Sequence, residues 1–158
     1  MNLYCLDTGV LIEPWNKHYS PELCPEYWEI LDDLAKKGVV FCTFEVRREL
    51  EKEDDGLYAW AKEKPHLFRE VTDDVNANMK KIMASHPELV DDKKGRSLAD
   101  PWVIAHAMAD KAIVVTTEMP ASKKIKIPDV CIAYKIPWIP EFEFAKKIGV
   151  RFSAKINE

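Results

Sequence analysis

The amino-acid sequence predicts an α/β fold with a mostly parallel central sheet. Short apolar segments alternate along the chain with longer segments of helical periodicity, the pattern of repeated strand and crossover-helix units. Residues 112–117 (AIVVTT) form the clearest strand, and its apolar start is typical of a central parallel strand covered on both faces. No internal repeat or low-complexity tract interrupts the 158 residues, so we expect a single domain over residues 1–158.

The first elements are a strand, a helix and a second strand. Residues 3–6 (LYCL) are the expected first strand, followed by a loop rich in proline and aromatic residues. A helix is predicted over residues 21–37, because Tyr27, Leu31 and Leu34 share one helical face and Gly38 can end it. Residues 39–42 (VVFC) are the expected second strand.

Helices dominate the middle of the chain. The helix that carries Glu49 is expected to continue to about residue 63, stopping before Pro65. Apolar residues from Val75 to Met83 recur at helical spacing after Thr72, which predicts a helix capped by that threonine. Residues 87–96 read as a charged connector.

The last part of the chain returns to alternating elements. A helix is predicted to begin at Asp100 and to run to about residue 110, before the strand at residues 112–117. Residues 128–134 indicate a short helix, residues 136–139 an edge strand, and residues 141–147 a last helix.

Composition limits the class of protein. With 47% hydrophobic and 32% charged residues, the chain is typical of a soluble globular protein, and no apolar run approaches the roughly 20 residues of a membrane span. We therefore expect no membrane association and a cytoplasmic location. The four cysteines stand singly, which indicates neither a zinc site nor a disulfide framework. A net charge of -4 argues against broad, salt-driven binding of nucleic acid.

Glu49 is the first candidate site residue. Val46, Glu49 and Leu50 have the spacing that places three side chains on one helical face, so Glu49 should point toward the core. An unpaired buried carboxylate costs several kcal/mol, roughly, and needs a cation or hydrogen-bond donors. An ion pair, or a side chain at the edge of the apolar stripe, is the alternative to a functional site.

Three more carboxylates stand at the edges of predicted elements. Asp7 ends the first strand, Asp100 opens a helix, and Glu118 follows the strand at residues 112–117. Each also has a structural explanation: Asp7 in a turn, Asp100 as a helix cap before Pro101, and Glu118 as an exposed loop residue. The four acids together favour one site, because ligands of open α/β sheets bind beyond the carboxyl ends of the strands.

The residue types indicate the chemistry of such a site. Carboxylates without cysteine or histidine partners are hard oxygen ligands, which suit Mg²⁺ or Mn²⁺. These ions neutralise phosphate oxygens and activate water, so the sequence predicts a metal-dependent phosphodiesterase. Lys123, Lys124 and Lys126 follow Glu118 and are candidate phosphate contacts, although basic runs are more often solvated surface.

Four motifs, in order, resemble the PIN-domain nucleases, a family that includes the VapC-type toxins. They are Leu6-Asp7-Thr8, the T-x-x-V-x-x-E-L of residues 43–50, the A-D-P-W-V-I-A of residues 99–105, and the V-V-T-x-E of residues 114–118. The chain looks most like a less-studied PIN subgroup that also carries the segment K-I-P-D-V-C, here residues 126–131.

The resemblance implies a PIN-like three-layer α/β/α domain and a set of site residues. The implied metal ligands are Asp7, Glu49, Asp100 and Glu118. Glu118 departs from the aspartate more usual at its position, so its contact could run through water or reach a second metal. Beside these ligands, the resemblance implies that Thr8 and Thr116 orient metal-bound water. Asp129 could add a carboxylate, or it could cap its short helix.

The resulting hypothesis is a Mg²⁺- or Mn²⁺-dependent endoribonuclease of PIN fold that leaves a 5′-phosphate. The resemblance also implies a toxin held in check by an antitoxin protein. Exposed tryptophans could serve a homodimer or partner interface, although core packing explains most of them equally well. The alternative function is a catalytically inactive PIN-like RNA-binding or scaffold protein.

Overall fold

The computed structural model describes residues 2–90, 98–120 and 124–157. Within these residues a five-stranded sheet has the order β3-β2-β1-β4-β5, and all its pairings are parallel. The strands are β1 (Tyr4–Leu6), β2 (Val40–Thr43), β3 (Phe68–Arg69), β4 (Ile113–Thr116) and β5 (Trp138–Pro140). The predicted α/β class with a parallel central sheet is confirmed.

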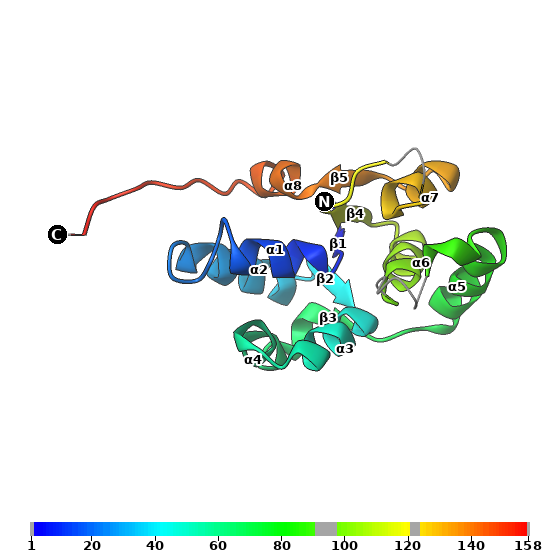
Figure 1. The fold of residues 1–158 in the computed structure, drawn as a ribbon, viewed down its shortest axis with the longest axis horizontal. Coiled ribbons are helices and arrows are strands. Elements are labelled where there is room, and N and C mark those ends of the chain that lie inside the picture. The colour runs from blue at the N-terminus through cyan, green and yellow to red at the C-terminus, as the bar shows by residue number, and fades with distance from the viewer. Residues whose placement is uncertain (1, 91–97, 121–123, 158) are drawn as a thin grey trace.

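Helices cover both faces of the sheet (Figure 1). On one face α6 contacts β1, β2 and β4, with α5 packed outside it; on the other, α2 contacts β2 and α8 contacts β4 and β5. The helices are α1 (Gly9–Asn16), α2 (Pro25–Lys36), α3 (Phe44–Glu53), α4 (Gly56–Lys62), α5 (Asp73–Ser85), α6 (Asp100–Asp110), α7 (Ile127–Ala133) and α8 (Glu141–Lys147).

The two central strands are buried, as their continuous apolar sequences predict. Cys5 and Leu6 of β1 and Val114 and Val115 of β4 have no exposed surface. A parallel strand between two helical layers has no solvent face, so alternation of polar and apolar residues is lost. The pairing of Leu6 with Val115 brings the carboxyl ends of the two strands level with each other.

The structure corrects the expected loop after the first strand. Residues Gly9–Asn16 form α1, even though Pro14 lies inside the helix. In this short helix the missing proline N–H removes one backbone hydrogen bond, while Val10, Leu11 and Pro14 are buried against the sheet. The stability gained by packing this apolar side exceeds the cost of the hydrogen bond lost at Pro14. Local sequence signals do not reveal this gain, because it depends on the packing of distant segments.

The prediction of one long helix that reaches residue 63 is also wrong. Asp54 adopts a left-handed conformation (φ 44°) that ends α3, and Asp55 starts α4 by accepting a hydrogen bond from the Tyr58 N–H. Turn-forming residues at positions 54–56 therefore separate two helices. The two-residue strand β3, which adds to the sheet edge beside β2, was not predicted.

Other local predictions are confirmed or refined. Thr72 caps α5 by accepting a hydrogen bond from the Val75 N–H at 3.3 Å. At α6 the capping position belongs to Ala99, so Asp100 is the first helical residue and not the cap. No helix within the described ranges has the length and apolar character needed to cross a membrane.

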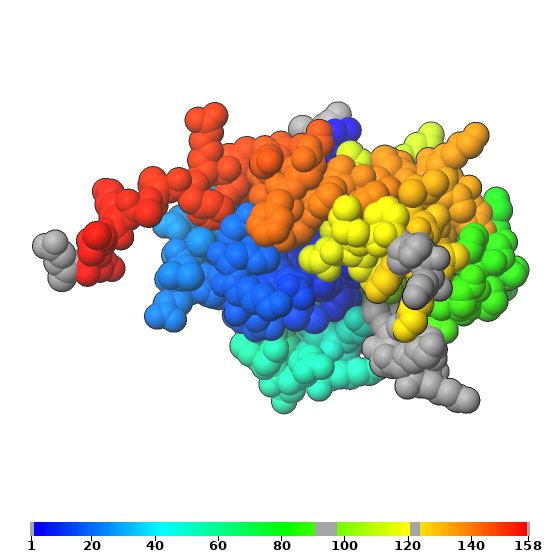
Figure 2. Space-filling view, turned by 45° about the horizontal axis from the view of Figure 1, so that its top comes forward, coloured from blue at the N-terminus to red at the C-terminus, as the bar shows by residue number. Residues whose placement is uncertain are grey.

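Figure 2 shows the surface of the molecule. There α1, in blue, is bordered by the segment after β4, in yellow, and by α3 and α4, in blue-green. Residues 150–157 have no helix or strand; the Phe152 ring still lies 5.0 Å from that of Tyr19, and the end of the segment runs away from the body (Figures 1 and 2).

Candidate functional site

Asp7 and Thr116 lie side by side because β1 and β4 are neighbours. The Asp7 N–H donates to the Val115 carbonyl at 3.0 Å, which continues the strand pairing by one residue. The Thr116 hydroxyl then donates to Asp7 Oδ2 at 3.0 Å. Both side chains are buried, so this bond fixes the Asp7 carboxylate at the carboxyl edge of the sheet.

The same hydroxyl connects Glu118 to this edge. Thr116 Oγ1 accepts a hydrogen bond from the Glu118 N–H at 3.1 Å. The Glu118 carboxylate accepts from the Ile127 N–H at 2.9 Å, at the start of α7. Glu118 is half-buried, which does not fit the alternative explanation of a fully exposed loop residue.

Glu49 reaches the start of α6 from α3. Its Oε1 accepts a hydrogen bond from the Ala99 N–H at 2.9 Å, and Ala99 is the capping residue of α6. Val46 and Leu50 are buried while Glu49 is half-buried, which confirms that these residues share the inner face of α3. Asp100 follows Ala99 directly and is buried, with only 6% of its surface exposed.

The carboxylates influence one another electrostatically. Burial and the negative charge of Glu118 raise the pKa of Asp7 from 3.8 to about 7, and Glu49 adds to the rise. The hydrogen bonds from the Thr116 hydroxyl and the Thr8 backbone act in the opposite direction. Glu118 and Glu49 therefore both lie near enough to act on Asp7, and Asp100 directly follows Ala99, whose N–H bonds Glu49.

Thr8 and Gly9 follow Asp7 at this edge of the sheet. The Thr8 hydroxyl is buried and has no hydrogen-bond partner among the residues that the structure describes. A Cβ atom at Gly9 would stand 2.6 Å from Thr117 Oγ1, so glycine allows α1 to begin against the end of β4. The glycine is visible in the sequence motif Asp-Thr-Gly, but its contact with Thr117, 108 positions later in the chain, could not be inferred from that motif.

The donor set fits a hard divalent cation. It consists of carboxylate and hydroxyl oxygens, including the unpartnered Thr8 hydroxyl, with no thiolate or imidazole. In the described ranges, no three Asp, Glu, His or Cys side chains are grouped closely enough to hold one metal ion. Mg²⁺ commonly takes only one or two protein carboxylates and keeps several waters, so it does not require such a group.

The remaining predicted residues differ in their surroundings. Asp129 accepts a hydrogen bond from the Lys126 N–H at 2.8 Å, the capping role given above as an alternative. Lys124 is exposed and Lys126 is half-buried, while Lys123 lies outside the described residues. The basic residues therefore follow Glu118 in the chain as expected, but their contact with a substrate stays a prediction.

The fold defines the class of protein. Two solved structures resemble the chain: VapBC-1 from nontypeable Haemophilus influenzae and VapBC2 from Rickettsia felis bound to a DNA fragment from their promoter. The first has a TM-score of 0.56 and 15% identity, covering 89% of this chain and 98% of the other. The second has a TM-score of 0.52 and 16% identity, covering 87% and 98%. The chain therefore has a VapC-like PIN fold, as its four motifs predicted.

The family is given by a match over nearly the whole sequence. Residues 4–152 match the family model described as "Domain of unknown function (DUF4411)", and the chain belongs to that family. No curated protein matches the sequence significantly. Function must accordingly be argued from the site.

Proposed function

We propose that this protein is a Mg²⁺- or Mn²⁺-dependent endoribonuclease. The observation that carries the proposal is the connection of Asp7 and Glu118 through the Thr116 hydroxyl at the carboxyl edge of the sheet, with Glu49 near enough to act on the charge of Asp7. Asp7 and Glu118 come from the ends of β1 and β4 and share the Thr116 hydroxyl, while Glu49 meets the residue before Asp100. Such an arrangement is expensive for stability, and binding a cation that acts on phosphate would explain it.

Asp7, Glu49, Asp100 and Glu118 would hold the metal, directly or through water. When bound, a divalent ion neutralises phosphate oxygens and activates water for attack on phosphorus. The chain's own contribution is to fix the ligands: Thr116 orients Asp7, and the Ala99 N–H orients Glu49. Thr8, whose hydroxyl is unpartnered in the described part of the chain, would orient a water molecule.

The proposed substrate is RNA, and the proposed protein partner is an antitoxin. Lys123, Lys124 and Lys126 would neutralise phosphates next to Glu118. The PIN fold shared with VapBC-1 and VapBC2 supports a toxin restrained by a partner protein, acting in the cytoplasm. An adjacent small gene for a DNA-binding protein would support this part of the proposal, and its product should bind the purified chain. Homodimer formation is a separate proposal, tested by the molar mass in solution.

A second candidate function is an inactive PIN-like RNA-binding or scaffold protein. It is favoured by the backbone hydrogen bonds of Glu49 and Glu118, which give both acids a structural role. It predicts RNA binding that is indifferent to Mg²⁺ and Mn²⁺ and no cleavage at any metal concentration.

Cleavage of RNA by purified variants separates the two functions. Asp100→Asn keeps the size and hydrogen-bonding capacity of the side chain but removes its charge, so it should abolish most metal-dependent cleavage while the protein stays folded. Glu51→Gln is the matched control, because Glu51 is exposed on α3, the same helix as Glu49. Cleavage by Asp100→Asn at the parent rate, or cleavage that persists in EDTA, contradicts the nuclease proposal.

A further inference from the structure

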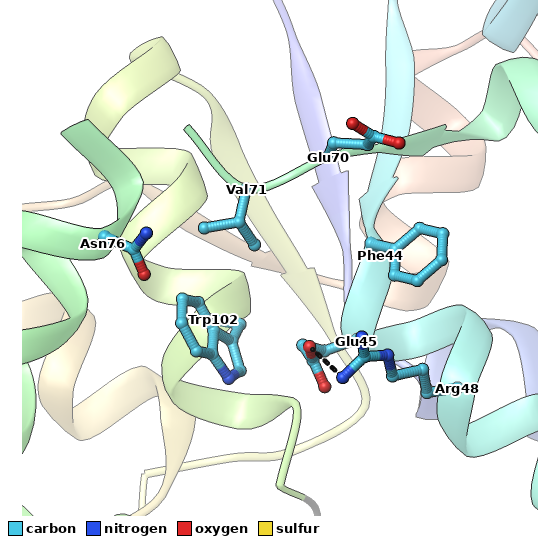
Figure 3. A pocket seen from close by; sticks show the side chains of 7 residues that line it. All are labelled: Phe44, Glu45, Arg48, Glu70, Val71, Asn76 and Trp102. Atoms are coloured by element: carbon cyan, nitrogen blue, oxygen red, sulfur yellow. Dashed lines mark ion pairs between the residues drawn. The ribbon is translucent and has the colours of Figure 1, made fainter. Parts of the chain in front are cut away.

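A cavity of about 380 Å³ adjoins α3 on the side of its first turn. Figure 3 shows Trp102 of α6 and Asn76 of α5 on one side of the space and Phe44, Glu45 and Arg48 of α3 on the other. Its volume is within the range of small-molecule sites.

The cavity is close to the proposed catalytic acids. Glu45 and Glu49 are four residues apart on α3, so their Cβ atoms are about 5–6 Å from each other along one face. Trp102 lies in the first turn of α6, two residues after Asp100. If the proposed acids hold the phosphate that is cleaved, a group bound in the cavity would therefore belong to a nucleotide adjacent to that phosphate.

Aromatic side chains give the cavity walls suited to a planar group. Trp102 and Phe44 are both half-buried, so part of each ring is accessible. The guanidinium groups of Arg47 and Arg48 lie 5.8 and 5.4 Å from the Phe44 ring centroid. Unpaired RNA bases bind proteins by stacking on aromatic rings and on guanidinium planes.

The charges of the lining favour a neutral base over a phosphate. Glu45 and Glu70 carry two negative charges and Arg48 one positive charge, so the lining is net negative by one. A phosphate would be repelled by the two carboxylates, and a cationic side chain would meet the guanidinium of Arg48. A ligand with both donors and acceptors on adjacent atoms matches this mixture.

Guanine matches the Glu45–Arg48 pair better than the other bases. The two side chains form an ion pair at 3.2 Å, so a carboxylate acceptor and a guanidinium donor stand next to each other. Guanine presents two adjacent donors, N1–H and N2–H, to a carboxylate, and the acceptors O6 and N7 to arginine. Adenine, cytosine and uracil each offer only one donor group at this edge. Arg48 is 62% exposed and can turn toward a bound base.

We propose that this cavity is a guanine subsite for single-stranded RNA. Trp102 supplies the stacking surface, Glu45 accepts hydrogen bonds from N1 and N2, and Arg48 donates to O6 or N7. The inference rests on the proposed ribonuclease function, since it places the guanine beside the phosphate to be cleaved.

Binding without cleavage tests the subsite. The probes are labelled pentamers of uridine RNA whose central nucleotide is guanosine, inosine, adenosine, cytidine or uridine, titrated with the full-length protein in EDTA. We expect the guanosine probe to bind about tenfold more tightly than the adenosine and uridine probes, within the range of one bidentate contact. Inosine, which lacks the N2 amino group, should lose most of that advantage.

Two variants assign the preference to named side chains. Glu45→Gln keeps the shape of Glu45 but removes a second acceptor, so the guanosine and inosine probes should bind with nearly equal affinity. Glu51→Gln, on exposed surface of the same helix, should retain the parent ratio. Trp102→Ala should weaken all five probes about tenfold, and Trp102→Phe should restore most of the binding. Circular dichroism spectra and melting temperatures establish that each variant is folded.

Three results would overturn the inference. The first is equal binding of all five probes by the parent protein, and the second is an unchanged ratio of guanosine to inosine affinity in Glu45→Gln. The third is tighter binding of a tri-arginine peptide than of every RNA probe, which would assign the cavity to a protein partner. Failure of the proposed function has a different signature. RNA cleavage in Mn²⁺ together with equal binding of all bases would support the nuclease proposal and contradict the guanine subsite. A preference for guanine in EDTA without any cleavage in Mn²⁺ would support the subsite and contradict the nuclease proposal.

Discussion

Replacement of Asp7 by Asn should stabilise the metal-free protein at neutral pH. Burial and the charge of Glu118 raise the pKa of Asp7 from 3.8 to about 7. Each unit of difference between the folded and unfolded pKa of Asp7 corresponds to about 1.4 kcal/mol in the free energy of unfolding. Ionised Asp7 therefore destabilises the fold by about 4 kcal/mol at and above pH 7. An uncharged Asn removes this cost.

Part of the gain is offset by a lost hydrogen bond. The Asp7 carboxylate accepts from the Thr116 hydroxyl and the Thr8 N–H, and the strength of these bonds to the charged form is already contained in the pKa of about 7. The further cost in the variant is that of a buried donor left without an acceptor, about 1–3 kcal/mol. Asn keeps one oxygen acceptor but loses the charge and the second oxygen. The expected net stabilisation is about 2 kcal/mol, which for a chain of this size raises the melting temperature by about 4–8 °C.

The pH dependence has a defined sign. The folded protein binds the Asp7 proton more tightly than the unfolded chain, so the destabilisation is fully present above pH 7 and disappears as the pH falls toward 3.8. The advantage of Asp7→Asn over the parent should accordingly shrink between pH 7 and pH 4.

Thermal melts in EDTA at several pH values, with and without millimolar Mn²⁺, provide the assay. Saturation at a hundred times Kd adds about 2.7 kcal/mol to the parent, and Asp7→Asn should gain less because a ligand is lost. Glu51→Gln is the exposed control. A parent protein indifferent to Mn²⁺ and Mg²⁺, together with a destabilised Asp7→Asn, would show that Asp7 is only a structural turn residue.

Two further predictions concern the surface and the packing of the site. Replacing Lys123, Lys124 and Lys126 with Ala should weaken RNA binding and reduce the dependence of the affinity on salt concentration, since fewer counterions are released. The control replaces Lys80, Lys146 and Lys147, which are exposed elsewhere, and should change neither quantity. An equal salt dependence in both variants would mean that the three lysines after Glu118 are ordinary surface residues. Gly9→Ala should destabilise the parent by about 1 kcal/mol through its 2.6 Å approach to Thr117 Oγ1. In a Thr117→Ala background the same change should cost nothing measurable in chemical denaturation, and an equal cost in both backgrounds refutes this contact as the cause.

Features set by local sequence were the most predictable. The burial of β1 and β4 follows from their continuous apolar segments, and the start of α5 follows from Thr72, whose side chain caps the helix. Glu49 was placed on the inner face of α3 by its spacing from Val46 and Leu50, and the structure agrees. Each of these depends on neighbours within one or two helical turns.

Features set by contacts between distant segments were not predictable. α1 forms despite Pro14 because its apolar side packs on the sheet, and the break at Asp54 depends on a left-handed residue that an aspartate only weakly favours. The hydrogen bond from the Ala99 N–H to Glu49 spans 50 positions. The grouping of the four acids in one site was inferred from their positions at the edges of predicted elements and from the resemblance to PIN domains, and it stays a prediction.

The most direct test of the central claim is the chemistry of the RNA ends. The parent protein is incubated with a single-stranded RNA in Mn²⁺, and the products are analysed for their termini beside reactions in EDTA and with Asp100→Asn. A metal-dependent site of carboxylates that activates water predicts fragments with 5′-phosphate and 3′-hydroxyl ends, formed only by the parent and only with metal. Fragments with 2′,3′-cyclic phosphates, or the same fragments from Asp100→Asn, would contradict the account.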